Sequence, residues 1–173
     1  MTDDSELWRQ ILRGNAEAFE SFYRESAPRL RAFLQQTVGS SQTAEDLMQE
    51  TFTQIWRQPN GFCPERGSLR AYLYGIARKQ AAEWWRSQNA QSIEIKDPPT
   101  PQRGETVCVL MDALRRLSHE QRMLLWLREV EGYSYAELAA ILVIPIGTVR
   151  SRLFAAREAL RTIWNGSPLK EEV

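Results

Sequence analysis

Positively charged side chains gather in two stretches of this 173-residue sequence, and the chemistry open to them is the binding of anions. Residues 66–86 carry five lysines and arginines against one acidic residue, and residues 147–161 carry four arginines against one glutamate. Residues 44–52 are instead acidic, with three carboxylates. Because clustered cations neutralise nucleic-acid phosphates, the two basic stretches are candidate DNA-binding surfaces, and the acidic one is a candidate protein-binding surface.

Catalytic and metal-binding chemistry has little material in this sequence. His119 is the single histidine, and Cys63 and Cys108 lie far apart with neither in a C-x-x-C pair. This pattern favours two reduced, structural thiols and leaves zinc sites and histidine-based triads without their usual residues. The sequence contains no phosphate-binding loop and no pairing of a nucleophile with a base. We therefore expect no metal, no cofactor, no small-molecule substrate and no enzymatic activity.

The overall composition is that of an ordinary globular protein, with 43% hydrophobic and 25% charged residues. The formal net charge is zero, which argues mildly against a free-standing DNA-binding domain because such domains are usually strongly basic. No apolar run approaches the roughly 20 residues that cross a bilayer, and the acidic N-terminus MTDDSELW is unlike a signal peptide. We therefore expect a cytoplasmic protein that does not insert into the membrane.

Helices are expected along most of the chain, because apolar residues recur at intervals of three and four and the alternation typical of strands is absent. In the first half, Thr43 is the expected cap of the third helix and Ser68 of the fourth. In the second half, Ser118 and Gln121 form a predicted capping box. The all-α prediction places helices at about 3–13, 16–38, 43–57, 68–86, 107–117, 118–132, 134–142 and from Gly147 onward.

Residues 87–106 interrupt the helical pattern. They contain Pro98, Pro99 and Pro101 and lack helical periodicity, which is typical of a linker. An ordered loop inside a single domain is the alternative, although 20 residues without secondary structure are unusual in a compact fold. We therefore predict two small helical domains joined by a flexible linker, with a first domain at 1–87, the linker at 88–106, a second domain at 107–166 and a tail at 167–173.

Residues 133–160 have the pattern of two helices joined by a tight turn that contains Pro145. In the second helix, apolar residues form a core stripe, and small residues lie opposite it with arginines along the edges. A narrow face of this kind suits insertion into the DNA major groove, where the helix front reads bases and its edges hold phosphates. An ordinary helical hairpin with a solvated basic face is the alternative. The core stripe consists of Val149, Leu153, Ala156 and Leu160.

Residues 131–157, with the sequence E-G-Y-S-Y-A-E-L-A-A-I-L-V-I-P-I-G-T-V-R-S-R-L-F-A-A-R, resemble the promoter-reading helix-turn-helix of extracytoplasmic-function sigma factors, a group of the bacterial sigma-70 family. The resemblance implies a region 4 domain whose helix-turn-helix, about residues 134–157, recognises the promoter −35 element. Val143 departs from the family pattern, which has glycine in the turn, and a left-handed backbone there would strain a β-branched residue. The implied −35 contacts are Thr148, Arg150, Ser151, Arg152 and Arg157.

Residues 44–56, with the sequence A-E-D-L-M-Q-E-T-F-T-Q-I-W, resemble the family's helix that docks on core RNA polymerase. Taken alone, the polar side of this helix would most simply be a solvated acidic face. The resemblance implies instead a region 2 domain that binds core polymerase through residues 44–57, and an acidic surface suits a partner rich in basic groups. The implied polymerase contacts are Asp46, Gln49, Glu50 and Phe52.

The following stretch, about residues 66–86, resembles the family segment that recognises and melts the −10 promoter element. We expect exposed aromatic rings interleaved with cations, because rings stack on unpaired bases and cations follow the backbone. Packing of Tyr74 or Trp85 against a neighbouring helix is the alternative. Lys79 and Glu83 stand where the family usually has asparagine and aspartate. The implied −10 contacts are Tyr74, Arg78, Lys79, Trp85 and Arg86.

Together the resemblances imply a sigma factor, which reads the −35 element as duplex and captures the −10 element as it melts. The implied partners are core RNA polymerase (the clamp helices of its largest subunit and the flap of the second), promoter DNA and an anti-sigma factor that would hold the protein at the inner membrane. The zero net charge fits weak DNA binding by the free protein. A helix-turn-helix transcription regulator that does not engage core polymerase is the alternative, but it leaves residues 44–86 unexplained.

Overall fold

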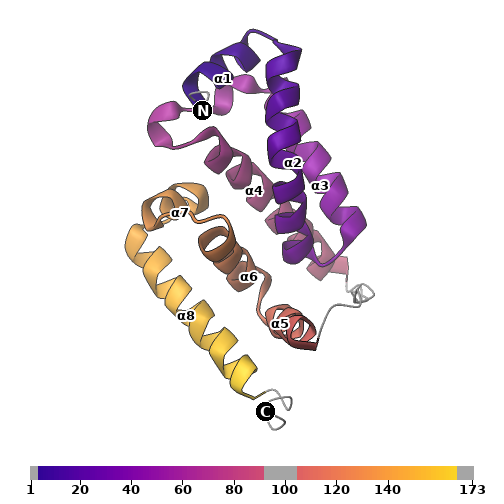
Figure 1. The fold of residues 1–173 in the computed structure, drawn as a ribbon, viewed down its shortest axis with the longest axis vertical. Helices are drawn as coiled ribbons and strands as arrows, with labels where there is room; N and C mark the ends of the chain where they lie inside the picture. Colours follow the sequence, from indigo (N-terminus) through magenta and orange to yellow (C-terminus); the bar gives the residue numbers. More distant parts are fainter. Residues whose placement is uncertain (1–3, 92–104, 167–173) are drawn as a thin grey trace. The chain divides into compact units, whose positions relative to one another are not determined.

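A computed structural model describes residues 4–91 and 105–166 of the chain, and every regular element in these ranges is helical (Figure 1). The chain forms two compact units, one built from the first four α-helices and the other from most of the last four. The prediction of an all-α protein with two small helical domains is confirmed. Most of the predicted linker, residues 92–104, lies outside the described residues.

The first unit consists of four α-helices and two short 3-10 turns. These elements are α1 (Asp4–Leu12), α2 (Ala16–Val38), α3 (Ser41–Arg57), η1 (Pro59–Gly61), η2 (Pro64–Arg66) and α4 (Leu69–Gln91). Helix α2 has the predicted bounds, whereas α4 continues to Gln91, five residues past its predicted end at Arg86. Figure 1 shows α2 and α3 running side by side, and α4 packs against both of them.

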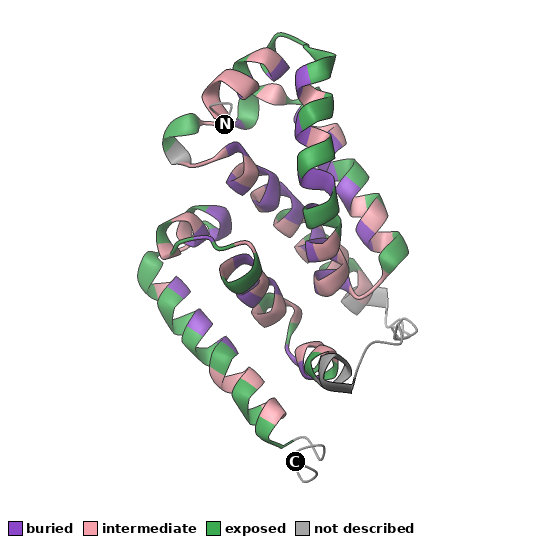
Figure 2. Cartoon of the chain, in the orientation of Figure 1, coloured by how far each residue is buried: buried purple, intermediate pink, exposed green. Residues whose placement is uncertain are grey.

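A continuous apolar core lies where α2, α3 and α4 meet. Figure 2 shows the buried positions recurring along one side of α2 and α3. Burial of each large side chain of this kind contributes about 1.5–3 kcal/mol, so this core dominates the stability of the unit. The most deeply buried members are Leu30, Phe33, Leu34, Val38, Ile55, Leu69, Leu73 and Tyr74.

Helix starts in the first unit are fixed by side-chain caps. The prediction that Thr43 caps α3 is wrong: the helix begins at Ser41, and the Ser40 hydroxyl accepts a hydrogen bond from the Thr43 N–H at 3.2 Å. Gly39, with a φ of 78°, ends α2 in a left-handed conformation and leaves Ser40 in position to cap. Helix α4 is capped by Ser68 as predicted, with its hydroxyl 3.1 Å from the Ala71 N–H.

The remaining elements, most of which form the second unit, are α5 (Glu105–Arg116), α6 (His119–Leu125), a short π-helical segment η3 (Trp126–Val130), α7 (Tyr135–Leu142) and α8 (Ile146–Asn165). The predicted capping box is confirmed, because the Ser118 hydroxyl and the Gln121 side chain each accept a backbone N–H of the other residue. The core stripe of α8 is also confirmed. Val149, Leu153 and Ala156 are buried, and Leu160 is half-buried.

Within the described residues, no single helix is long and apolar enough to span a bilayer. Helices α7 and α8 meet that length and composition test only when they are counted as one segment, although the chain bends by 100° between them. A bent pair carries little weight, because the core helices of soluble proteins pass the same test.

Candidate nucleic-acid and protein interfaces

The chain turns sharply between α7 and α8. The two helices are bent by 100° across residues 143–145, within the roughly 90–120° of helix-turn-helix motifs. Ser134 and Glu137 cap α7 reciprocally: the Ser134 N–H donates to Glu137 Oε2 at 2.8 Å, and the Glu137 N–H donates to Ser134 Oγ at 3.2 Å. Pro145 forms the N-cap of α8. The predicted helix-turn-helix geometry is therefore present.

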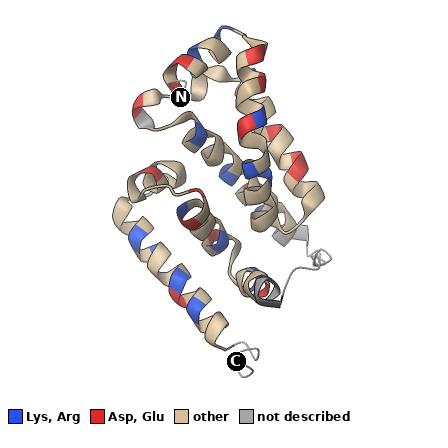
Figure 3. Ribbon diagram, viewed as in Figure 1, with Lys and Arg blue, Asp and Glu red and all other residues tan. Residues whose placement is uncertain are grey.

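The first two turns of α8 present four of the predicted −35 residues close together. Arg150, Ser151 and Arg152 are exposed and Thr148 is half-buried, whereas Val149 on the opposite side is fully buried. The Ser151 hydroxyl donates to the Thr148 carbonyl at 3.1 Å within the helix. Figure 3 shows basic residues spaced along α8. This placement leaves guanidinium and hydroxyl groups accessible to a nucleic acid.

Arg157, the fifth predicted −35 residue, is exposed but held in an intramolecular ion pair. Its Nη2 and Nε donate to Oε1 of Glu129 at 2.6 Å and 3.2 Å. Hydrogen bonds to Glu129 and Tyr135 raise the pKa of Arg157 above its usual value, because they stabilise the charged guanidinium. The guanidinium carbon of Arg128 lies over the same Tyr135 ring, 5.0 Å from its centroid. Any anionic ligand of Arg157 would therefore have to compete with Glu129.

The turn of the helix-turn-helix is strained at Val143. Its φ is 54°, and it is the only non-glycine residue with a positive φ in the part of the chain that the structure describes. A left-handed conformation brings Cβ close to the following carbonyl oxygen, at a cost of about 1–2 kcal/mol. Val143 is also 81% exposed, so packing does not offset this cost. Valine at this position therefore destabilises the turn relative to glycine.

Two exposed apolar side chains on α8 were missed by the sequence analysis. Phe154 is 68% exposed and Ile146 is 43% exposed, on a helix whose buried stripe is formed by other residues. Apolar side chains of this kind can contact the thymine methyl group in a major groove. The signal available in the sequence was the position of Phe154 outside the apolar stripe.

The outer side of α3 brings together three of the four predicted polymerase contacts. Asp46, Gln49 and Glu50 are all exposed, and we call this set the α3 outer face. Gln42 Nε2 donates to Asp46 Oδ1 at 3.1 Å, and Gln49 Nε2 donates to the Tyr23 hydroxyl of α2 at 3.1 Å. No cation among the described residues pairs with the Glu50 carboxylate. The face therefore offers exposed negative charge to a partner.

Phe52, the fourth predicted polymerase contact, lies in the core. It is 2% exposed, and its ring packs against Phe19, Phe22 and Tyr23, with centroids 6.2, 5.9 and 4.6 Å away. The prediction that Phe52 reaches a partner is therefore corrected. Helix α2 supplies three rings that surround Phe52, so its part is to support α3 from beneath.

Trp56 is an exposed aromatic residue that the sequence analysis did not select. It lies near the end of α3, is 42% exposed and packs on Phe19 with a centroid distance of 4.8 Å. Seven residues separate it from Gln49, which is two helical turns, so both side chains lie on the same side of α3. Tryptophan is enriched among the residues that dominate protein interfaces, and this spacing was the signal available in the sequence.

The predicted −10 residues divide by burial along α4. Lys79 and Arg86 are exposed, and Arg78 and Trp85 are half-buried. The Trp85 Nε1–H donates to the carbonyl of Thr37 in α2 at 3.3 Å. This bond ties one side of the indole to α2, so only part of the ring remains accessible to a base.

Tyr74 lies in the core rather than on the surface, which corrects the expectation of an exposed ring. It is 1% exposed and packs edge-to-face with Phe33 of α2, at a centroid distance of 5.1 Å. The alternative that this ring packs against a neighbouring helix is the one that holds. Because α4 contacts both α2 and α3, more of its circumference is covered than a single apolar stripe suggests.

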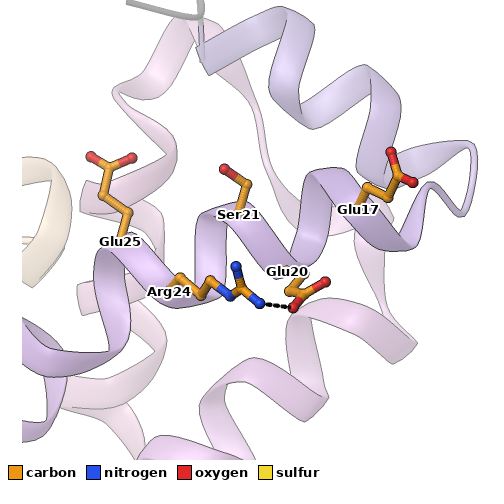
Figure 4. Close-up of a pocket in the computed structure, with 5 residues that line it drawn as sticks. All are labelled: Glu17, Glu20, Ser21, Arg24 and Glu25. Carbon is orange, nitrogen blue, oxygen red and sulfur yellow. Dashed lines mark hydrogen bonds and ion pairs between the residues drawn. The ribbon is translucent and has the colours of Figure 1, made fainter.

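A surface hollow on α2 is lined by Glu17, Glu20, Ser21, Arg24 and Glu25 (Figure 4). These side chains stand along one helix without converging, and Arg24 pairs with Glu20 at 2.6 Å. No group of three His, Cys, Asp or Glu side chains that could hold a metal ion occurs within the described ranges. The hollow shows no nucleophile paired with a base, and the exposed faces of α3, α4 and α8 are the better candidates for a functional surface.

Comparison with known protein families matches both halves of the chain. The family described as Sigma-70 region 2 matches residues 22–91, and Sigma-70, region 4 matches residues 109–160. The first match contains the α3 outer face and α4, and the second contains the helix-turn-helix. The predicted polymerase, −10 and −35 contact residues all fall inside the two matched regions.

Individual relatives agree with this assignment. The RNA polymerase sigma-H factor of Pseudomonas aeruginosa is 30% identical over 91% of this chain and 91% of its own length. The ECF RNA polymerase sigma factor SigK of Mycolicibacterium vanbaalenii is 29% identical over 90% of this chain and 86% of its own length.

Solved structures give the same result. The sigma factor RpoE of Bartonella quintana, solved with the anti-sigma factor NepR, has a TM-score of 0.73 at 28% identity and covers 88% of this chain and 99% of its own. CnrH, solved with the cytosolic domain of CnrY, has the same fold with a TM-score of 0.75, at 22% identity over 95% of this chain and 98% of its own. From the matched regions and relatives together, the chain belongs to the sigma-70 family of RNA polymerase sigma factors, in the extracytoplasmic-function group.

Proposed function

We propose that this protein binds core RNA polymerase and directs promoter-specific transcription initiation, with no catalysis of its own. One observation carries the proposal: a single chain combines the exposed acidic α3 outer face in its region 2 match with an arginine-bearing helix-turn-helix in its region 4 match. A transcription regulator that acts without polymerase needs only the second feature. The domain limits 1–87, 88–106 and 107–166 belong to this proposal.

The second unit reads the −35 element. Helix α8 enters the major groove with Thr148, Arg150, Ser151 and Arg152 at its front, and Arg157 holds a phosphate further along the helix. Their exposure on α8 supports this role, as does the burial of the core stripe on the opposite side. Bidentate arginine contacts to guanine give base specificity, and the remaining guanidinium groups hold the backbone.

The first unit binds polymerase through the α3 outer face and captures the −10 element through α4. The exposed carboxylates of Asp46 and Glu50 suit a basic surface on the polymerase clamp helices, and the flap of the second large subunit receives region 4. Lys79 and Arg86 follow the DNA backbone, while Arg78 and the accessible part of Trp85 meet unpaired bases. Tyr74 acts indirectly, by packing α4 onto α2.

An anti-sigma factor controls the protein in this proposal. RpoE of Bartonella quintana, one of the structural neighbours, was solved in complex with the anti-sigma factor NepR. A partner of this kind would cover the polymerase- and DNA-binding surfaces and would hold the protein in the cytoplasm, at the inner membrane where the anti-sigma factor is anchored. Zero net charge favours this arrangement, because free protein would bind DNA weakly.

Co-purification with core polymerase separates this function from the alternative regulator. Full-length protein is mixed with bacterial core RNA polymerase and passed over a gel-filtration column. We expect comigration that is lost on substitution of Glu50 by lysine. Folded protein that elutes apart from core polymerase while still binding DNA would favour the regulator.

A further inference from the structure

We propose that Tyr23 of α2 is a positioning residue for polymerase binding, because it holds Gln49 of the α3 outer face in the orientation used for contact. This inference rests on the proposed function. The Tyr23 hydroxyl accepts a hydrogen bond from Gln49 Nε2 at 3.1 Å, across 26 residues of sequence. Tyr23 is half-buried and Gln49 is exposed, so the bond joins a ring packed in the unit to a side chain on its surface.

The Tyr23 ring is fixed before any partner arrives. It packs on Phe52 with a centroid distance of 4.6 Å, and Phe52 is 2% exposed. An aromatic pair of this kind stabilises the packing beyond the contribution of its buried area. The buried Phe52 therefore influences the α3 outer face indirectly: it supports the Tyr23 ring, and the Tyr23 hydroxyl holds Gln49.

Gln49 is held from a second side along α3. Its Nε2 also lies 3.2 Å from Oε1 of Glu45, and Arg31 of α2 donates from Nε to the other oxygen of that carboxylate at 2.9 Å. Arg31 Nη2 in turn lies 3.2 Å from the Ser41 hydroxyl. Both acceptors of the Gln49 amide are thus tied to α2, one directly and one through Arg31.

This arrangement matters because a free glutamine side chain must be ordered on binding. Immobilising such a side chain at an interface opposes binding, and a side chain already held in place avoids much of that cost. The amide N–H groups of Gln49 point at Tyr23 and Glu45, so its carbonyl oxygen is left to accept a hydrogen bond from the partner. Tyr23 therefore sets which end of the amide faces polymerase.

The test is a double-mutant cycle on affinity for core polymerase, with Tyr23→Phe and Gln49→Ala in full-length protein. Tyr23→Phe removes one oxygen and keeps the ring on Phe52. We expect it to weaken binding about threefold to tenfold, the usual effect of one net hydrogen bond, without lowering the melting temperature. In the Gln49→Ala background the same change has no further effect. Tyr72→Phe, at another half-buried tyrosine of the first unit, leaves affinity unchanged.

Two outcomes overturn the proposal, and Glu50→Lys tells them apart. In the first outcome, Glu50→Lys weakens binding, but Tyr23→Phe binds as wild type or the Tyr23 and Gln49 effects simply add. Tyr23 then has no positioning role, and the α3 outer face is still the polymerase contact. If Glu50→Lys and Gln49→Ala both bind as wild type, the face itself is wrong. The polymerase contact assigned under the proposed function then fails together with the positioning role.

Discussion

Glu129 accepts two hydrogen bonds from Arg157 through one oxygen atom, Oε1, at 2.6 Å and 3.2 Å. The carboxylate belongs to η3, and the guanidinium belongs to the helix assigned to −35 recognition. An exposed pair of this kind contributes about 0–1 kcal/mol, which contact with a DNA phosphate can replace. Under the proposed function, we therefore expect Glu129 to set how readily Arg157 engages DNA.

Substituting Glu129 by glutamine should strengthen DNA binding. We expect Glu129→Gln to bind a −35 duplex about twofold to fivefold more tightly, because Arg157 no longer has to leave a carboxylate. The salt dependence should steepen by about one phosphate contact. Fluorescence anisotropy over a salt series measures both quantities. Glu158→Gln is the matched control, since it removes the same charge but releases Arg161 instead; an equal gain in both variants would contradict the role of Glu129.

Replacing Val143 by glycine should stabilise the helix-turn-helix. Glycine removes the left-handed strain of about 1–2 kcal/mol but costs chain entropy, so we expect a net gain of about 0.5–1 kcal/mol in the free energy of unfolding. Urea unfolding followed by circular dichroism measures it. Val130→Gly, at an exposed valine in the helical segment η3, should instead lose stability. A loss in both variants would show that Val143 is not strained.

Reversing the charge of Glu50 should strongly weaken polymerase binding without unfolding the protein. We expect Glu50→Lys to weaken affinity for core polymerase at least tenfold, because a cation then faces a basic partner surface. Glu20→Lys makes the same charge change in the hollow on α2 and should leave affinity close to wild type. Competition binding with labelled core polymerase measures both variants. Equal effects would indicate attraction by overall charge rather than a specific contact.

Substituting Tyr74 should lower the stability of the protein, whereas substituting Lys79 should slow promoter opening and leave stability almost unchanged. Truncating the buried Tyr74 to alanine should cost about 3–5 kcal/mol of stability, as for other large core side chains. The exposed Lys79 should tolerate Lys79→Ala within about 0.5 kcal/mol, while the holoenzyme opens a promoter more slowly. Urea unfolding and permanganate footprinting measure the two effects. A stable Tyr74→Ala protein would contradict the core assignment.

The sequence predicted the elements well and their surroundings less well. Helix α2 and the capping box at Ser118 follow from local signals, because periodicity and caps depend on residues a few positions apart. The cap of α3 was placed at Thr43 instead of Ser40, since both hydroxyls are compatible and only the left-handed Gly39 decides between them. Boundaries of this kind depend on backbone conformation, which residue types only partly specify.

The errors at the candidate sites concern side chains that meet distant parts of the chain. A helical wheel shows which residues share a face, but not how many neighbours cover the helix. Tyr74 is buried because Phe33 lies against it, and Trp85 is tied to the carbonyl of Thr37, 48 residues away. The family resemblance implies a polymerase contact for Phe52, whose position in the sequence does not reveal the rings of α2 around it. The ion pair of Arg157 is equally non-local.

Transcription by reconstituted polymerase tests the central claim most directly. Purified protein is added to bacterial core RNA polymerase on a library of promoter fragments, and the transcripts are sequenced. We predict discrete transcripts that depend on the protein, start downstream of shared −35 and −10 sequences, and disappear with Glu50→Lys. Folded protein that yields no specific transcripts and does not associate with core polymerase would contradict the claim that it directs promoter-specific initiation.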